Sequence, residues 1–114
     1  MSRTCFAAGR HGRTCDHARQ RHHVVKQQHI KVRHASLRAA HRRGGPAPAW
    51  KLATGLKDRR LWRWICWAHH QLEHSGKLRV ESSDLPDGFW DAVAEYGLER
   101  WVPSHLVNPE AKEA

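Results

Sequence analysis

The sequence predicts a small α+β protein, and three stretches of the chain support that fold class. Residues 61–66 (LWRWIC) are rich in aromatic and branched side chains, which is typical of a strand with Trp62 and Trp64 on one face. Residues 66–76 (CWAHHQLEHSG) follow as a short helix, which should end at its last glycine because glycine favours a left-handed cap. Residues 86–97 have apolar side chains at helical spacing and predict a C-terminal helix. A chain of 114 residues is long enough for one small domain of this kind.

The remaining elements are predicted from composition. Residues 23–25 should be extended, and residues 34–43 (HASLRAAHRR) should form a short basic helix because no glycine or proline interrupts them. The glycine- and proline-rich residues 42–48 then form a loop, and residues 77–80 are a further extended piece. Trp50 is expected to be exposed, whereas the other tryptophans are expected to build the core of so small a domain. These core tryptophans are Trp62, Trp64, Trp67, Trp90 and Trp101.

Apolar segments and cysteines indicate a cytoplasmic protein with no membrane partner. The chain has no run of about 18 apolar residues to span a bilayer, and residues 1–13 lack the apolar centre of a secretory signal. Three cysteines cannot all pair within one chain, and a reducing compartment favours metal binding over disulfides. Cys5, Cys15 and Cys66 are therefore candidate thiolate ligands.

Positive charge is concentrated in the N-terminal part of the chain. Residues 1–43 contain eleven Lys or Arg and one acid, Asp16, while the rest of the chain is close to neutral. Such asymmetry favours a polyanionic partner, because each cation that neutralises a phosphate also releases condensed counterions. The alternative is a solvated basic arm with no nucleic-acid partner. The candidate contacts to nucleic acid are Arg19, Arg21, Lys26, Lys31 and Arg33.

Two histidines of the predicted helix share one face. His70 and His74 lie four residues apart and so stand one turn above each other, whereas Ala68 and Leu72 point to the opposite side. Both imidazoles would then face away from the apolar residues and could bind a metal. Taken alone this spacing is weak evidence, because it often occurs by chance on surface helices.

Two further pairs of residues add metal-ligand chemistry. Cys66 and His69 lie three residues apart at the junction of strand and helix, a spacing that zinc knuckles use. His22 and His23 are adjacent and run into a branched segment, so one imidazole could hold a metal while the other works beside it. Coincidence is the alternative for adjacent histidines in a chain that has eleven of them.

Taken together, these residues resemble the HNH endonuclease family, which has the small ββα-metal (His-Me finger) fold. The matching segments are, in order, CFAAG at 5–9, HHVV at 22–25 and ICWAHHQLEH at 65–74. The resemblance implies an HNH-like nuclease core over residues 1–80, with a basic N-terminal half. It also implies that residues 81–114 are a C-terminal helical extension that packs on this core.

The resemblance implies a role for each histidine of the match. His22, His70 and His74 would bind the catalytic divalent metal, which could be Mg²⁺, Mn²⁺, Ni²⁺ or Zn²⁺. His23 would be the catalytic residue, a general base that activates water for hydrolysis of a phosphodiester bond. The implied substrate is DNA. Small nucleases of this family in bacteriophages and bacteria further imply a phage terminase as a protein partner.

The chain departs from the family pattern at three positions. Leu61 stands where the family has an Asn that fixes the loop carrying the base, and leucine cannot supply that hydrogen bond. Ala8 stands where the second cysteine of the first zinc knuckle belongs, so that knuckle is degraded. His69 replaces the second cysteine of the later knuckle. Low or lost catalytic activity is one expectation from the first departure.

A structural zinc site is the second metal site that the resemblance implies. Cys5, Cys66 and His69 supply three ligands, and Cys15 would be the fourth if the intervening loop folds back. The alternative is that no zinc binds and that Cys5 and Cys15 are free thiols.

Three functions remain open at this point. The first is a metal-dependent DNA endonuclease. The second is a catalytically silent relative that keeps the fold and basic arm as a DNA-binding or packaging module. The third is a small zinc-binding regulator in which His70 and His74 complete the zinc site. The sequence is equally compatible with a monomer and a dimer.

Overall fold

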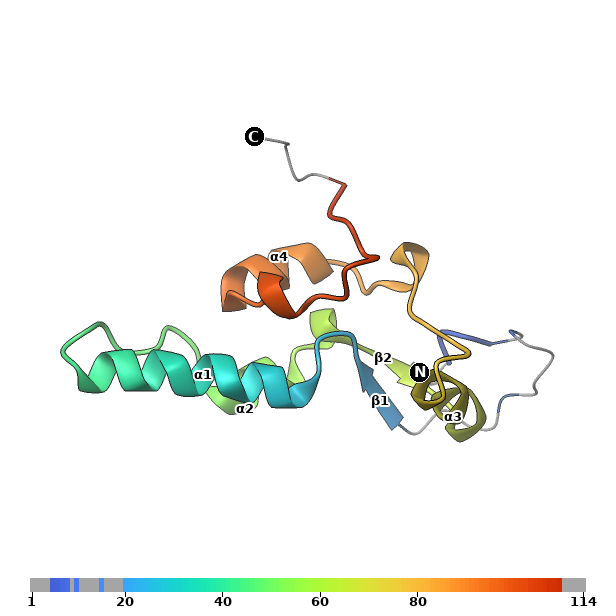
Figure 1. The fold of residues 1–114 in the computed structure, drawn as a ribbon, viewed down its shortest axis with the longest axis horizontal. Coiled ribbons are helices and arrows are strands. Elements are labelled where there is room, and N and C mark those ends of the chain that lie inside the picture. The colour runs from blue at the N-terminus through green and yellow to red at the C-terminus, as the bar shows by residue number, and fades with distance from the viewer. Residues whose placement is uncertain (1–4, 9, 11–14, 16–19, 110–114) are drawn as a thin grey trace.

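The computed structural model describes residues 5–8, 10, 15 and 20–109, and its helices and strands confirm an α+β fold. The elements along the chain are β1 (Gln20–His23), α1 (Gln27–Arg42), α2 (Leu52–Lys57), β2 (Trp62–Ile65), α3 (Trp67–His74) and α4 (Phe89–Tyr96) (Figure 1). Short 3₁₀ helices occupy Arg59–Leu61, Ser82–Asp84 and Glu99–Trp101. Within the described ranges, no helix has the length and apolar character needed to cross a bilayer.

The two strands, β1 and β2, pair in antiparallel fashion and form a two-stranded sheet. Their register is Gln20 with Ile65, Arg21 with Trp64, His22 with Arg63, and His23 with Trp62. The rings of Trp62 and Trp64 meet edge to face at 4.8 Å, and the Arg21 guanidinium lies 4.8 Å from the Trp62 ring. The prediction that both tryptophans share one face is confirmed, and Arg21 covers that face from the neighbouring strand.

Helix α1 is longer than the sequence predicted. It begins at Gln27 instead of His34, because residues 27–33 contain no helix breaker. Ile30 is the one residue of this helix that is fully buried. A mostly polar first half gives little apolar periodicity, so the pattern did not reveal it. The helix ends where expected, before Gly44. The φ of Gly44 is +96°, which is incompatible with a right-handed helix.

The C-terminal part of the chain also differs in detail from the prediction. Helix α4 begins at Phe89, three residues after Pro86, and ends at Gly97 as expected, where a φ of +67° forms a left-handed cap. Residues 77–80 form no strand in the described part of the chain. The buried Leu78 and Val80 anchor this stretch without ladder hydrogen bonds.

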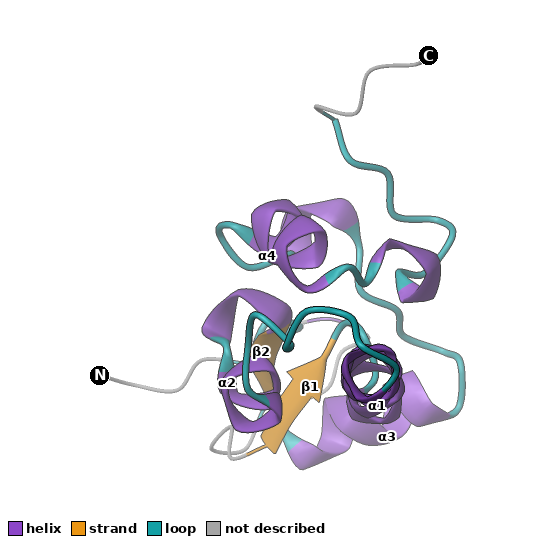
Figure 2. Ribbon diagram, turned by 90° about the vertical axis from the view of Figure 1, so that its left-hand side faces the viewer, coloured by secondary structure: helices purple, strands orange, loops and turns teal. Residues whose placement is uncertain are grey.

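Helix α4 covers the layer that contains the sheet and supplies much of the larger core (Figure 2). The buried residues of this core are Val24, Val25, Ile30, Leu61, Val80, Phe89, Ala92, Val93, Tyr96, Leu98 and Leu106. A smaller cluster lies under α3 and contains Cys5, Ala7, Ile65, Cys66, Leu72 and Leu78. The predicted division at residue 80 stays a prediction, but side chains from both sides of it share the larger core.

Two tryptophans lie where the sequence analysis did not expect them. Trp67 is 62% exposed, because it is the first residue of α3 and points away from both core clusters. Trp50 is half-buried and meets Tyr96 edge to face at 4.8 Å. Gly55 makes room for it, since a Cβ there would lie 2.9 Å from the Trp50 ring.

Asp58 connects the turn before β2 to α4. Its carboxylate accepts hydrogen bonds from the Arg60 guanidinium and from the Tyr96 hydroxyl, both at 2.7 Å. The Arg60 side chain is the largest cause that lowers the pKa of Asp58 to about 2, against the opposing effect of burial. The ionised carboxylate is therefore worth roughly 2 kcal/mol to the folded state at neutral pH.

Asp58→Asn is expected to lower the free energy of unfolding at pH 7 by roughly 2 kcal/mol. Because the folded pKa is depressed, this contribution exists above the unfolded pKa and disappears as the pH falls from about 5 towards 2. Urea unfolding of both proteins at each pH measures the difference. The exposed Asp87→Asn is the control and should change little; an equal loss in both variants would contradict this role for Asp58.

Candidate metal centres

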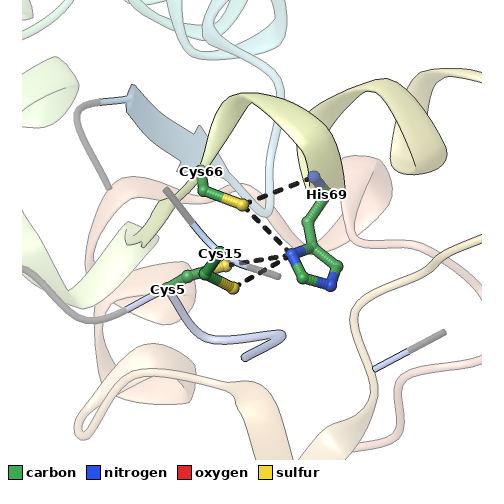
Figure 3. A group of neighbouring side chains, drawn as sticks. All are labelled: Cys5, Cys15, Cys66 and His69. Atoms are coloured by element: carbon green, nitrogen blue, oxygen red, sulfur yellow. Dashed lines mark hydrogen bonds between the residues drawn. The ribbon is translucent and has the colours of Figure 1, made fainter. Parts of the chain in front are cut away.

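Four side chains from distant parts of the sequence converge beside the start of α3. Cys5, Cys15, Cys66 and His69 place their ligand atoms within 4.8 Å of one another and could hold a metal ion (Figure 3). We call them the cysteine cluster. His69 Nδ1 lies 3.8, 3.2 and 3.1 Å from the sulfurs of Cys5, Cys15 and Cys66. A tetrahedral zinc with ordinary bond lengths separates S and N ligand atoms by about 3.5 Å, so the spacing fits such an ion.

The local structure explains why these residues meet. Cys66 is the N-cap of α3, and its sulfur accepts a hydrogen bond from the His69 backbone N–H at 3.5 Å, which brings both side chains to the same side. The Phe6 N–H donates to the Trp64 carbonyl at 2.9 Å and so fastens the N-terminal segment along β2. That contact holds Cys5 next to Cys66.

A hydrogen bond on the far side of the His69 ring fixes its tautomer. His69 Nε2–H donates to the Arg10 carbonyl at 2.9 Å, which leaves the Nδ1 lone pair directed at the three sulfurs. The Arg10 guanidinium in turn forms a two-pronged ion pair with the buried Asp84, with one contact at 2.8 Å. The carbonyl that orients His69 is thus itself held in position.

The protonation of the thiols also suits a cation. Burial is the largest single influence on Cys66 and disfavours its thiolate, but hydrogen bonds from the His69 backbone and ring and from the other two cysteines together lower the pKa of Cys66 to about 7. Burial, followed by the neighbouring thiols, raises the pKa of Cys15 to about 11. Ionisation of Cys15 at neutral pH therefore requires a nearby positive charge such as a bound metal.

A second group of potential metal ligands is formed by residues of β1 and α3. His22, His70 and Glu73 bring their ligand atoms within 4.8 Å of one another. We call them the histidine group. His22 Nδ1 lies 4.0 Å from a carboxylate oxygen of Glu73, and the His22 side chain is only 12% exposed. The ring of Phe6 stacks on His22 at 5.8 Å and shields it from one side.

His70 directs its Nε2 atom towards His74. Its Nδ1–H donates to the side-chain oxygen of Gln20, so the Nε2 lone pair remains available. This Nε2 lies 3.1 Å from Nε2 of the exposed His74. His74 therefore stands beside the histidine group, and its predicted role as a ligand stays a prediction.

The histidines of this group are neutral at physiological pH. Burial is the largest cause that lowers the pKa of His22, against the opposing effect of Glu73. Burial, with a further contribution from His74, lowers the pKa of His70. Neutral imidazoles carry the lone pair that a metal requires, so no proton has to leave before a cation binds.

The imidazole of His23 is fixed at both ring nitrogens. Its Nε2–H donates to the Leu56 carbonyl at 2.9 Å, and the Gln27 amide lies 3.3 Å from its Nδ1. Burial lowers the pKa of His23 despite the hydrogen bond to Leu56, so the ring is neutral with a lone pair on Nδ1. Leu61, at the position expected for Asn, is fully buried in the larger core.

Both the histidine group and His23 open onto one solvent-facing groove. The groove is lined by Arg21, His22, His23, Lys26, Gln27, His70, Glu73 and His74. Among the predicted contacts to nucleic acid, Arg21 and Lys26 are exposed at its rim, and Lys31 is exposed one turn into α1. Arg33 instead points inward, because its Nε donates to the Tyr96 carbonyl at 3.3 Å. Arg19 lies outside the described residues.

Sequence reasoning missed the polar partners of this groove. Glu73 lies three residues after His70, so its position on the same helix face was a usable signal. Gln20 and Gln27 gave no comparable signal, because their roles depend on how β1 approaches the two helices. The Leu56 contact is made by a backbone carbonyl, which any residue could supply.

Comparison with known proteins gives no family assignment for the chain. No protein-family model matches it, and no match is found among curated proteins or among solved structures. The function of the chain is therefore inferred from the geometry of the cysteine cluster, the histidine group and the groove.

Proposed function

We propose that this chain is a metal-dependent DNA endonuclease of the HNH type that hydrolyses phosphodiester bonds. The observation that carries the proposal is the meeting of His22 from β1 with His70 and Glu73 from α3, next to His23 in the same groove. The order of β1, β2 and α3 is that expected for a ββα-metal core, which supports the proposal.

The donor set of the histidine group fits a divalent cation. Two neutral imidazoles and one carboxylate, with His74 beside them, suit Mn²⁺, Ni²⁺ or Zn²⁺ and also offer Mg²⁺ an oxygen ligand. When bound, such a cation supplies Lewis-acid stabilisation of the charge that develops on the phosphate and the leaving oxygen. The partly open groove leaves room for a phosphate next to these ligands.

His23 is suited to accept the proton of the attacking water. Its Nε2–H is held by the Leu56 carbonyl, so the basic position is Nδ1. Nδ1 accepts a hydrogen bond from the Gln27 amide at 3.3 Å. The attacking water would donate to Nδ1 from the same direction. Arg21 and Lys26 at the rim of the groove can hold the substrate phosphate.

The cysteine cluster is proposed to bind a structural zinc ion. Three sulfurs and one imidazole form a closed set of four ligands, which is the usual composition of a structural zinc site. This set is complete without His70 and His74, which argues against a zinc regulator that uses those histidines in its zinc site. The ion would fasten the N-terminal segment to α3 and so hold the histidine group in place.

A catalytically silent DNA-binding module is the second candidate function. Leu61 favours it, because this fully buried side chain cannot provide the hydrogen bond that Asn would give the loop carrying the base. The contacts of His23 with Leu56 and Gln27 argue for the active enzyme, since they orient the imidazole without that Asn.

Cleavage of supercoiled plasmid separates the two functions. With Mg²⁺, Mn²⁺ or Ni²⁺ the wild type is expected to nick the plasmid, EDTA should stop it, and His23→Ala should slow it by roughly 10²–10⁴-fold. His105→Ala, outside the groove, is the matched control, and circular dichroism verifies that each variant is folded. If no metal supports nicking while the protein still binds DNA in a salt-dependent way, the silent module is the better description.

A further inference from the structure

Helix α1 carries a row of exposed cations along one face. Lys31, Arg38 and Arg42 are seven and four residues apart, so they lie in line on the helix surface. We call these three residues the α1 stripe. All three are exposed, and none of them forms an ion pair with an acidic group in the residues that the structure covers. Helix α1 itself contains no acidic residue.

Packing on the opposite face fixes the direction of this row. Ile30 is fully buried, and Gly55 of α2 approaches it closely enough that a Cβ there would lie 3.4 Å from the Ile30 side chain. Arg33 donates to the Tyr96 carbonyl and turns inward towards α4. The helix therefore cannot rotate about its axis without breaking these contacts, and the stripe stays directed at solvent.

The stripe begins at the groove of the proposed active site. Gln27 lies one turn before Lys31 on the same face, lines the groove and hydrogen-bonds to His23. From Lys31 to Arg42 the helix advances by about 16 Å at 1.5 Å per residue. Figure 1 shows α1 extending away from the sheet, with α3 at the opposite end. A row of positive charge thus leads from the groove to the end of the helix.

We propose that the α1 stripe binds the phosphate backbone of duplex DNA beside the cleaved bond. This inference rests on the proposed nuclease function and specifies how its substrate is held. Phosphates lie in rows along a duplex, and unpaired Lys and Arg on a rigid helix match them in charge and spacing. Such contacts position the duplex without reading its bases, so the stripe confers affinity and orientation with no sequence preference.

Removal of the two outer charges tests the stripe. Arg38→Gln/Arg42→Gln is compared with Arg59→Gln/Arg100→Gln, which removes the same charge from exposed residues on the side of α4. Binding to a short duplex is measured over a range of salt, without added divalent metal, and a denaturing gel verifies that the duplex stays intact. We expect the stripe variant to bind roughly tenfold or more weakly at about 0.1 M salt. The slope of log K against log salt should also fall by about 2.

The control double variant should keep affinity and slope close to those of the wild type. Equal losses in both variants would overturn the proposal, because net charge would then explain binding. Unchanged binding in the stripe variant, or tighter binding of single-stranded DNA or RNA than of duplex, would also overturn it. Thermal melting verifies that all variants fold. If the wild type does not nick plasmid but the stripe variant binds duplex DNA more weakly as expected, only the nuclease function is refuted. If the wild type nicks plasmid but the stripe variant binds duplex DNA as tightly as the wild type, only this inference is refuted.

Discussion

Cys66→Ser is expected to abolish metal binding by the cysteine cluster and to lower the melting temperature by more than about 15 °C. Structural zinc contributes roughly 10–16 kcal/mol in small zinc domains, which is as much as the whole stability of an ordinary domain. Cys66 is also central to the smaller core, whose other members are Cys5, Ala7, Ile65, Leu72 and Leu78. Without an ion, the described N-terminal residues would be held to α3 by the packing of Cys5 and Ala7 and by the hydrogen bond between Arg10 and His69.

The serine variant isolates the metal contribution from the cap of α3. A serine oxygen at position 66 can still accept the His69 N–H, so the helix start is preserved while a strong metal ligand is lost. Elemental analysis of the purified proteins gives the zinc content, and circular dichroism gives the melting temperature. A chelator should unfold the wild type in the same way, and added zinc should restore it. A wild type that melts normally without bound metal would instead establish the cysteines as packed free thiols.

His70→Ala is expected to reduce metal-dependent nicking by at least about 100-fold, because loss of a ligand should cost more than loss of a group that only orients one. His70 belongs to the histidine group, faces His74 through Nε2 and is oriented by Gln20 through Nδ1, so its loss removes a ligand and disturbs its neighbour. Gln20→Ala should have a smaller effect, a roughly 10–100-fold weaker metal affinity, because it changes only the orientation of the ligand. Nicking rates measured against metal concentration separate the two, since excess metal should rescue Gln20→Ala only.

Gln71→Ala is the matched control for both His70→Ala and Gln20→Ala. Gln71 is an exposed neighbour on the same helix and is not part of the groove lining, so nicking should remain close to wild type. All three variants should bind as much zinc as the wild type at the proposed site in the cysteine cluster, and equal zinc content would indicate that the helix is intact. Unchanged nicking in His70→Ala would remove the histidine group from the mechanism.

Helix α3 and the Cys66–His69 half of the cysteine cluster could be predicted from the sequence because their signals are local. Cys66 and His69 have knuckle spacing, and the helix ends near Gly76, whose φ of +80° is the left-handed conformation that glycine favours. Cys15 was inferred from the need for a fourth ligand, and the structure brings it within 3.2 Å of the His69 ring. No spacing rule joins Cys15 to His69, so Cys15 could be predicted only because a structural zinc site needs four ligands.

The parts that the sequence did not reveal depend on long-range packing. The polar first half of α1 has little apolar pattern, so its helical state follows from continuity with the second half and from burial of Ile30. Trp67 resembles its buried neighbours in composition, and only the direction of the first turn of α3 exposes it. Glu73 and Gln20 acquire partners only once β1 and α3 lie together.

The pairing of β1 with β2 has a consequence for how the chain folds. Helices α1 and α2 lie between the two strands in sequence, so the sheet cannot nucleate as a tight hairpin. Its formation must close a long loop before the ladder hydrogen bonds compensate the lost chain entropy, whereas α1 depends on contacts between neighbouring residues. Both groups of potential metal ligands also draw on residues from each side of this loop. Helix α1 can therefore form early. The groove beside its first turn is complete only when β1 and α3, which lie far apart in the sequence, have packed together.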